Sequence, residues 1–163
     1  MIGHAITKFI SSKIVHDLPP YSVSSKTLTL VMIEAGDGVV DEVIADLKQV
    51  AGREQRLARK MLPRYVALSS DVRYIRDHTK TLFIVGAFKA SRLSKATEVW
   101  LYATKHLKPA HMREVRELWQ DWLSEQSGLL FARANCPESS RMLKFLGFTF
   151  IAETAGVEIY RTN

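Results

Sequence analysis

The sequence predicts a single α/β domain, with a mixed, mostly antiparallel and twisted sheet flanked by helices. Its 163 residues fit one domain, for which roughly 100–200 residues is usual. Apolar residues make up 47% and charged residues 25%, as is typical of a globular chain that can bury a core. Short β-branched and apolar runs alternate with segments of helical periodicity, and this alternation predicts one central sheet.

Two strands and a loop are predicted before the first helix. Met1–Phe9 is short and apolar enough to be an opening strand. Ser11–Ser25 contains two consecutive prolines, which favour a loop. Thr27–Ile33 is β-branched and apolar, and we predict a strand there.

One helix is predicted over Val39–Met61. Its apolar residues recur at spacings of three and four, which gives a single apolar stripe: Val40, Val43, Ile44 and Leu47. Asp37 is a candidate N-cap. Gly52 is expected to break or kink the helix, and Pro63 to end it.

A β-hairpin is predicted next, from the strands Thr81–Phe88 and Glu98–Ala103. The first is almost wholly apolar, with Gly86 inside it. The connection between them contains a turn over Ser91–Ser94 and is unusually basic.

The helix Pro109–Gln126 has the clearest pattern in the chain. Proline suits a first helical turn, and Gly128 is a plausible C-cap. The apolar residues share one face, so Trp119 and Trp122 are predicted to be core residues.

The C-terminal elements follow in close order. We predict a strand over Leu129–Ala134, a helix over Pro137–Leu146 that Gly147 terminates, and closing strands over Phe148–Ile151 and Val157–Arg161.

Composition limits the classes of function. The net charge of +6 favours an anionic partner such as nucleic acid, a phosphorylated cofactor or an acidic protein surface. No apolar run approaches the ~20 residues of a membrane-spanning helix, and we expect no membrane span. The N-terminus lacks the pattern of a secretory signal, so secretion is not expected. Cys136, the only cysteine, can form neither an internal disulfide nor a Cys-rich zinc site.

The last half of the chain resembles the GNAT acetyltransferase fold. The resemblance rests on the strand Glu98–Ala103, the long helix after it, the strand Leu129–Ala134 and the run Asn135–Phe148 (NCPESSRMLKFLGF). In that family, Asn, a short helix and a Gly-Phe pair precede the next strand. Residues 81–161 carry the resemblance, whereas residues 1–80 match no motif, and we expect 1–163 to form one GNAT-like domain.

A narrower resemblance is to GNAT-like internal virion or head-assembly proteins of short-tailed bacteriophages. It rests on Trp100 in its strand, a basic helix with Arg113 and Arg116, and Asn135, followed by the run Arg141–Lys144 before a glycine. This resemblance implies a structural or virion-assembly protein that uses a catalytically degenerate fold as a protein–protein interaction module.

The GNAT resemblance also implies a place for the pyrophosphate of acetyl-CoA, at backbone N–H groups at the start of the long helix. The family carries glycines there, whereas this chain has no glycine between Gly86 and Gly128 and places Pro109 at the helix start. We therefore expect no cofactor in the leading interpretation. If acetyl-CoA binds, the candidate contacts are Lys105, His106, Lys108 and Asn135.

Catalytic candidates are few. Many GNAT enzymes place a tyrosine four residues before the Gly-Phe glycine as the general acid, but that position here is Leu143. Tyr102 is an alternative phenol. Glu98 and His106 are the candidate bases near the expected cleft. The histidines have no metal-ligand spacing, and no metal site is predicted.

A basic segment lies in the predicted first helix, formed by Arg53, Arg56, Arg59, Lys60 and Arg64. Such a set can follow a nucleic-acid backbone, or it can simply be a solvated helix face.

Three functions are thus open. The leading one is the phage assembly module, with other protein subunits or virion components as partners, in the host cytoplasm or the virion. The alternative is a divergent N-acetyltransferase that transfers acetyl from acetyl-CoA to an amine. The third is a nucleic-acid-interacting accessory protein.

Overall fold

The computed structural model describes residues 22–24, 28–33, 38–47, 52–90 and 95–162. In this part of the chain, eight strands form one sheet in the order β1-β2-β3-β4-β5-β6-β8-β7. The strands are β1 (Ser22–Ser24), β2 (Thr29–Met32), β3 (Asp71–Arg76), β4 (Thr81–Lys89), β5 (Ala96–Ala103), β6 (Leu129–Ala134), β7 (Phe148–Thr154) and β8 (Val157–Thr162). The helices are α2 (Val39–Ala45), α3 (Gly52–Leu68), the 3₁₀ turn η1 (Pro109–His111), α4 (Met112–Glu125) and α5 (Pro137–Phe145).

The sheet is mostly antiparallel, as predicted. Strands β1 to β5 pair in sequence order, each antiparallel to the next. Strands β6, β8 and β7 form a second antiparallel set. The two sets meet at β5 and β6, which pair in parallel because the chain crosses over through α4.

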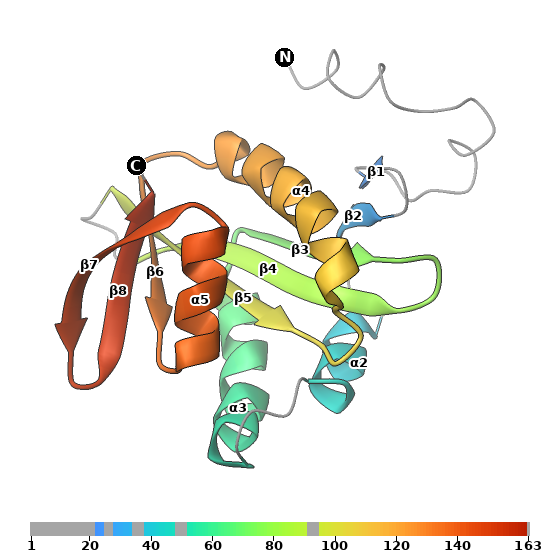
Figure 1. Cartoon of the computed structure of the whole chain (residues 1–163), viewed down its shortest axis with the longest axis horizontal. Coiled ribbons are helices and arrows are strands. Elements are labelled where there is room, and N and C mark those ends of the chain that lie inside the picture. Colours follow the sequence, from blue (N-terminus) through green and yellow to red (C-terminus); the bar gives the residue numbers. More distant parts are fainter. Residues whose placement is uncertain (1–21, 25–27, 34–37, 48–51, 91–94, 163) are drawn as a thin grey trace.

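Each face of the sheet has its own core. Figure 1 shows α4 over one face and α2 and α3 under the other. From Phe83 to Phe88, residues of β4 alternate between the two cores, as the pleat of a strand requires. The core under α4 and α5 includes Phe83, Val85, Val115, Trp119, Trp122, Leu143 and Tyr160. The core over α2 and α3 includes Val39, Val43, Leu62, Tyr74, Ile84 and Trp100.

The structure confirms most of the C-terminal predictions. Strand β6 has the predicted bounds, and β4 and β5 form the predicted hairpin. Trp119 and Trp122 are both buried. Gly147 ends α5 with φ of +96°, a left-handed backbone that glycine adopts without strain.

The N-terminal predictions need three corrections. The predicted loop Ser11–Ser25 contains strand β1, whose pairing with β2 its composition does not reveal. The segment Val39–Met61 forms two helices and not one, which confirms the expected break near Gly52, and Gly52 itself begins the second helix. The N-cap of α2 is Gly38, not Asp37.

Pro63 lies inside α3 instead of ending it. A helix-interior proline leaves the carbonyl four residues earlier without its N–H partner. Here both Pro63 and Arg59 are exposed, so water can reach that carbonyl. Leu62, fully buried on the opposite side of the helix, keeps α3 against the sheet.

Strand β3 was not predicted. Its charged residues are not typical of a strand inside a sheet, so the alternation of its apolar residues was overlooked. Arg73 forms ion pairs with Asp71 and Glu125. The predictions for Met1–Phe9 and for the turn Ser91–Ser94 fall outside the described residues.

None of the described helices combines the length and the apolarity that crossing a bilayer requires.

Candidate active site

A cavity of about 610 Å³ opens where β5 and β6 separate. The two strands pair only from Ala96↔Leu129 to Glu98↔Phe131. Beyond this point β5 continues to Ala103, whereas β6 keeps only its pairing with β8, which lies along its other edge and runs from Phe131 to Ala134. The cavity is lined by β5 from Glu98 to Ala103, by Ala132 and Arg133 of β6, and by side chains of α3 and α5.

One backbone edge of β5 faces this gap. The amide of Thr104 donates to Leu82 O at 3.0 Å, and the amide of Ala90 donates to Ala96 O at 3.1 Å. Even-numbered residues of β5 therefore direct their backbone groups to β4, and odd-numbered ones direct theirs to β6. Since β6 has turned away, Val99, Leu101 and Ala103 present N–H and C=O groups to the cavity. An extended chain with amide groups of its own can pair with such an edge.

Glu98 lies at the narrow end of the cavity. Its side chain is 3% exposed, and its Oε2 accepts a hydrogen bond from Arg133 Nη2 at 2.9 Å. Burial raises the pKa of the Glu98 carboxyl, and the Arg133 charge opposes that rise. A buried carboxyl with a raised pKa and an open cavity beside it is suited to accept a proton.

Three aromatic rings cover the cavity wall beside Glu98. Tyr65 of α3 stacks on Trp100 at 5.7 Å between ring centroids, and also on Phe88 at 5.8 Å. Tyr102 lies at 6.1 Å from Trp100. Trp100 Nε1 donates to Ser69 Oγ at 2.8 Å, which fixes the indole. The wall is therefore a rigid aromatic surface.

Two phenols line the cavity, and their positions differ. Burial, and next the charge of Glu98, raise the pKa of Tyr65. Burial also raises the pKa of Tyr102. Tyr102 is four residues from Glu98 along β5, about 13 Å at the rise of an extended strand. Tyr65 stacks on Phe88, the cross-strand partner of Glu98, so it is the better placed proton donor of the two.

In the loop after β5, the backbone N–H groups donate hydrogen bonds to acceptors within the protein. Lys105 N donates to Asp46 O at 2.8 Å, and Leu107 N to Thr104 O at 3.2 Å. His106 N donates to Thr104 Oγ1 at 3.3 Å. The amides of Lys108 and His111 bond within η1: Lys108 N donates to His111 Nδ1, and His111 N donates to Lys108 O, each at 3.0 Å. These five N–H groups have protein acceptors, so they form no open cradle for a phosphate.

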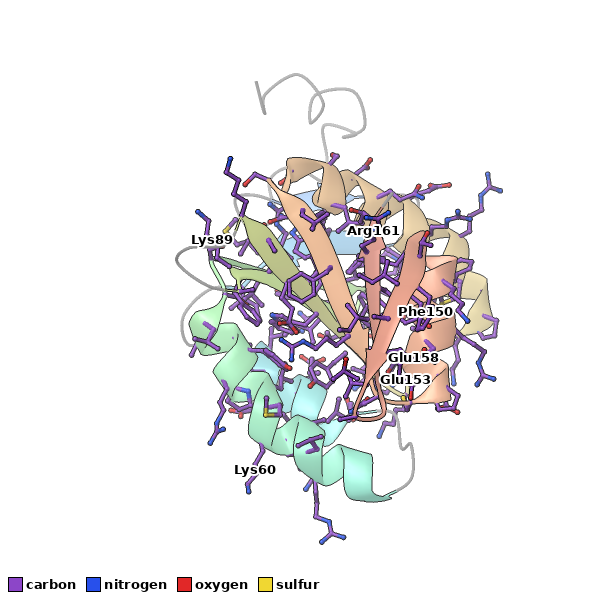
Figure 2. The ribbon with its side chains drawn as sticks, turned by 90° about the vertical axis from the view of Figure 1, so that its left-hand side faces the viewer. Lys60, Lys89, Phe150, Glu153, Glu158 and Arg161 are labelled. Atoms are coloured by element: carbon purple, nitrogen blue, oxygen red, sulfur yellow. The ribbon has the colours of Figure 1, made fainter. Side chains whose placement is uncertain are left out.

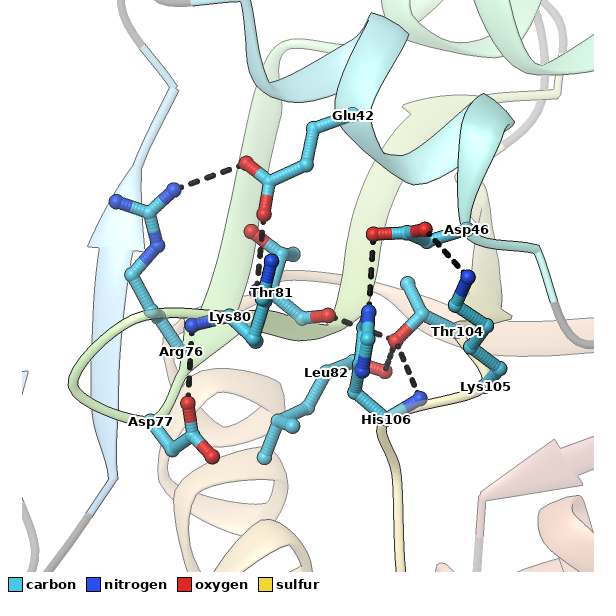
Figure 3. A network of polar contacts seen from close by, with 10 residues as sticks. All are labelled: Glu42, Asp46, Arg76, Asp77, Lys80, Thr81, Leu82, Thr104, Lys105 and His106. Atoms are coloured by element: carbon cyan, nitrogen blue, oxygen red, sulfur yellow. Dashed lines mark hydrogen bonds and ion pairs between the residues drawn. The ribbon is translucent and has the colours of Figure 1, made fainter.

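The side chains of Lys105 and His106 are turned to Asp46 (Figure 3). Lys105 Nζ lies 3.1 Å from Asp46 Oδ1, and His106 Nε2 lies 3.0 Å from Oδ2. The hydrogen bond from His106, and next that from Lys105, lower the pKa of the Asp46 carboxyl. Neither residue is among those that line the cavity, so the structure separates His106 from Glu98 and Tyr102.

The remaining predicted residues have varied positions. Asn135 follows β6 and lines the cavity at its exposed mouth. Lys108 is exposed beside η1. Leu143 is buried in the core and lines the cavity, so no phenol stands at that position. Cys136 caps α5 by accepting from Ser139 N. Among the described residues, no group of three or more His, Cys, Asp or Glu side chains could hold a metal ion.

The basic candidates on α3 point outward. Arg56, Arg59, Lys60 and Arg64 are exposed, whereas the side chain of Arg53 lies outside the described residues. Figure 2 shows Lys60 projecting from α3 away from the sheet. The opposite face of the same helix lines the cavity through Leu57, Ala58, Met61 and Tyr65.

Sequence reasoning missed Tyr65, Arg133 and Asp46. Tyr65 follows Leu57, Ala58 and Met61 at helical spacing, a signal that the expected end of the helix at Pro63 obscured. Arg133 is one charged residue in an apolar strand. Nothing in the sequence pairs it with Glu98, since 35 positions separate the two residues.

Solved structures that resemble this chain have the GNAT fold. A protein of Desulfovibrio desulfuricans assigned to the GNAT acetyltransferases is 13% identical, with a TM-score of 0.58 over 83% of this chain and 98% of that one. A spermidine N-acetyltransferase chimera from Vibrio cholerae and hSSAT is 12% identical, with a TM-score of 0.56 over 83% and 95%. The ribosomal-protein-S5-alanine acetyltransferase of Vibrio fischeri is 17% identical, with a TM-score of 0.52 over 86% and 94%.

No protein-family model matches the sequence. No curated protein matches it either. At these identities the structural similarity establishes the fold alone, and it confirms the predicted single GNAT-like α/β domain. The resemblance to phage virion proteins has no counterpart among the structures described above.

Proposed function

We propose that this protein is an N-acetyltransferase that transfers an acetyl group from acetyl-CoA to an amine. The observation that carries the proposal is the open edge of β5 in a cavity that ends at a buried carboxyl. The GNAT fold supports it, since the similar structures include acetyltransferases. Acetyl transfer therefore replaces the phage assembly module as the leading function.

The cavity fits one part of acetyl-CoA and not another. The extended arm carries two amide groups, and the odd-numbered residues of β5 offer donors and acceptors to such a chain. The pyrophosphate has no open amide cradle, because the loop amides from Lys105 to Lys108 have protein acceptors. Side chains near this loop, such as Lys108, and Asn135 at the cavity mouth would then contact the phosphate end through a less directional site.

The chemistry divides between two side chains of the cavity. When bound, acetyl-CoA supplies the acetyl group as a thioester. Glu98 accepts one proton from the ammonium of the acceptor, so that the neutral nitrogen can attack the carbonyl carbon as the C–S bond breaks. Tyr65 passes the second proton from nitrogen to the leaving sulfur. The amide and the free thiol form, and Glu98 returns its proton to solvent.

The substitution Glu98→Gln tests this function. It keeps the size of the side chain and its bond to Arg133 but removes the base. We expect kcat to fall by about 10²–10⁴-fold, the usual contribution of a positioned base. The rate is followed by release of the CoA thiol. The matched control is Glu153→Gln, an exposed carboxyl on β7 (Figure 2), which should leave the rate unchanged. Equal rates for both variants would exclude Glu98 as the base.

A second candidate is a binding module without catalysis. The occupied loop amides and Leu143 in place of a phenol favour it. A virion-assembly role belongs to this candidate and stays a prediction, as does nucleic-acid binding by the exposed α3 cations. Such a module would bind no acetyl-CoA and would release no thiol with any amine.

A further inference from the structure

The wall of the cavity on the α3 side is apolar and aromatic. Leu57, Ala58 and Met61 line it from one helix face, and Tyr65 completes that face. Tyr65 stacks on Trp100, whose indole is fixed by Ser69. The side chain of Leu57 remains 48% exposed at the edge, so this surface is open to a ligand. A rigid apolar wall of this kind binds an apolar body better than a hydrated chain.

The ionised side chains of the cavity are matched in charge. Glu98 pairs with Arg133 at 2.9 Å, and Glu138 pairs with Arg141 at 3.4 Å. These four are the charged residues among those that line the cavity. Each carboxylate therefore already has a cation beside it. A ligand with several positive charges would therefore find no unpaired carboxylate among the lining residues for its additional charges.

The outer face of α3 adds to this selectivity. Arg56, Arg59, Lys60 and Arg64 are exposed on the helix whose other face forms the cavity wall. Within the described residues, none of these four cations forms an ion pair with an acidic side chain. Their positive potential on this side of the molecule disfavours the approach of polycations relative to amines of single charge.

We propose that the acceptor is a primary amine with a single positive charge and an apolar, preferably aromatic, body. The amine nitrogen lies at Glu98, and the apolar body lies against Met61 and Tyr65. Polyamines and lysine-rich peptides are disfavoured by their charge. This inference rests on the proposed function, because it assigns the second substrate of the same site.

Binding and turnover of two amines test the proposal separately. Phenethylamine has one charge and an aromatic ring, whereas spermidine has three charges and no ring. We expect calorimetry to show phenethylamine binding roughly tenfold or more tightly than spermidine. Thiol release from acetyl-CoA should follow the same order. Equal or tighter binding of spermidine would overturn the acceptor assignment.

Binding that follows the expected order without thiol release would instead contradict the proposed acetyl transfer, while the amine site would still be supported.

A pair of variants tests whether the cavity wall determines the preference. Met61→Glu adds a carboxylate to the cavity wall and should shift the binding preference toward spermidine. Ile151→Glu adds the same charge at an exposed position on β7, outside the cavity, and should not. If both variants behave alike, the selectivity does not come from the cavity wall, and the assignment fails.

Discussion

Arg133 on β6 donates to Glu98 on β5 across 2.9 Å. Glu98 and Phe131 are the last paired residues before the two strands separate, and Arg133 lies two residues beyond that point. The pair thus marks the narrow end of the cavity. Glu98 is buried, while the Arg133 side chain is 55% exposed. The carboxylate is held in place from the β6 side, and the cavity opens from it along the free edge of β5.

Removing the Arg133 charge should move the pH dependence of the reaction. Burial raises the pKa of Glu98 and Arg133 opposes it, so Arg133→Met raises that pKa further. A base works only when deprotonated, and the acidic limb of the kcat/KM profile should move to higher pH. Arg133→Lys keeps a positive charge, so the acidic limb should move less than in Arg133→Met. NMR titration of the Glu98 carboxyl gives the same comparison without turnover, and an unmoved titration would contradict the pairing.

The same pair predicts how stability depends on pH. A carboxyl whose folded pKa is raised favours the folded state while it is protonated, so its contribution is present at low pH. That contribution is lost as the pH rises through the folded pKa. The free energy of unfolding of Arg133→Met should therefore fall more steeply with rising pH than that of the natural chain. Urea unfolding at a series of pH values measures the difference.

Gly86 is required by Trp100. A Cβ at position 86 would overlap the indole of Trp100, which lies against the β4 backbone there. Gly86→Ala should destabilise the fold by about 1–3 kcal/mol, the usual cost of overpacking. Urea unfolding checks this. Adding Trp100→Leu removes the overlap, so the two losses should be less than additive. Fully additive losses would show that the two residues do not conflict.

Asp46 should stabilise the loop after β5 in a pH-dependent way. Its pKa is lowered by the bonds from His106 and Lys105, so its contribution is present above the unfolded carboxyl pKa and lost as the pH falls through the folded one. Asp46→Asn should therefore lower Tm near neutral pH, and the difference should close in acid. Lys105→Met is the control. It should cost little, since that side chain is 61% exposed. A difference in Tm that persisted in acid would contradict this role.

The predictability of the fold differed along the chain for physical reasons. The helix that contains Trp119 and Trp122 was predicted because its apolar face repeats without interruption. Strand β3 was not, because Arg73 is tolerated only through Asp71 and Glu125, and Glu125 is distant in sequence. The predicted end of the helix at Pro63 was wrong. A helix can continue through a proline when water reaches the carbonyl that lacks its N–H partner, and no local sequence pattern shows that exposure.

Only the site residues that lie together on one strand, β5, could be predicted from the sequence. Glu98 and Tyr102 share a face of β5, and both line the cavity as expected of residues in that strand. His106 was expected beside them, but Asp46, 60 positions earlier in the sequence, turns it away. The partners Arg133 and Tyr65 come from other elements, and only the folded arrangement brings them to Glu98.

The most direct test of the account is calorimetric titration of the purified protein with acetyl-CoA. We expect acetyl-CoA to bind saturably, with a Kd below about 1 mM. We also expect Ala103→Phe, which adds a ring to the cavity lining beside the open edge of β5, to abolish binding, and Tm shows whether this variant is folded. Ile151→Phe, at an exposed position on β7 outside the cavity, is the matched control and should bind normally. No heat of binding at millimolar acetyl-CoA, or equal binding by both variants, would contradict the account.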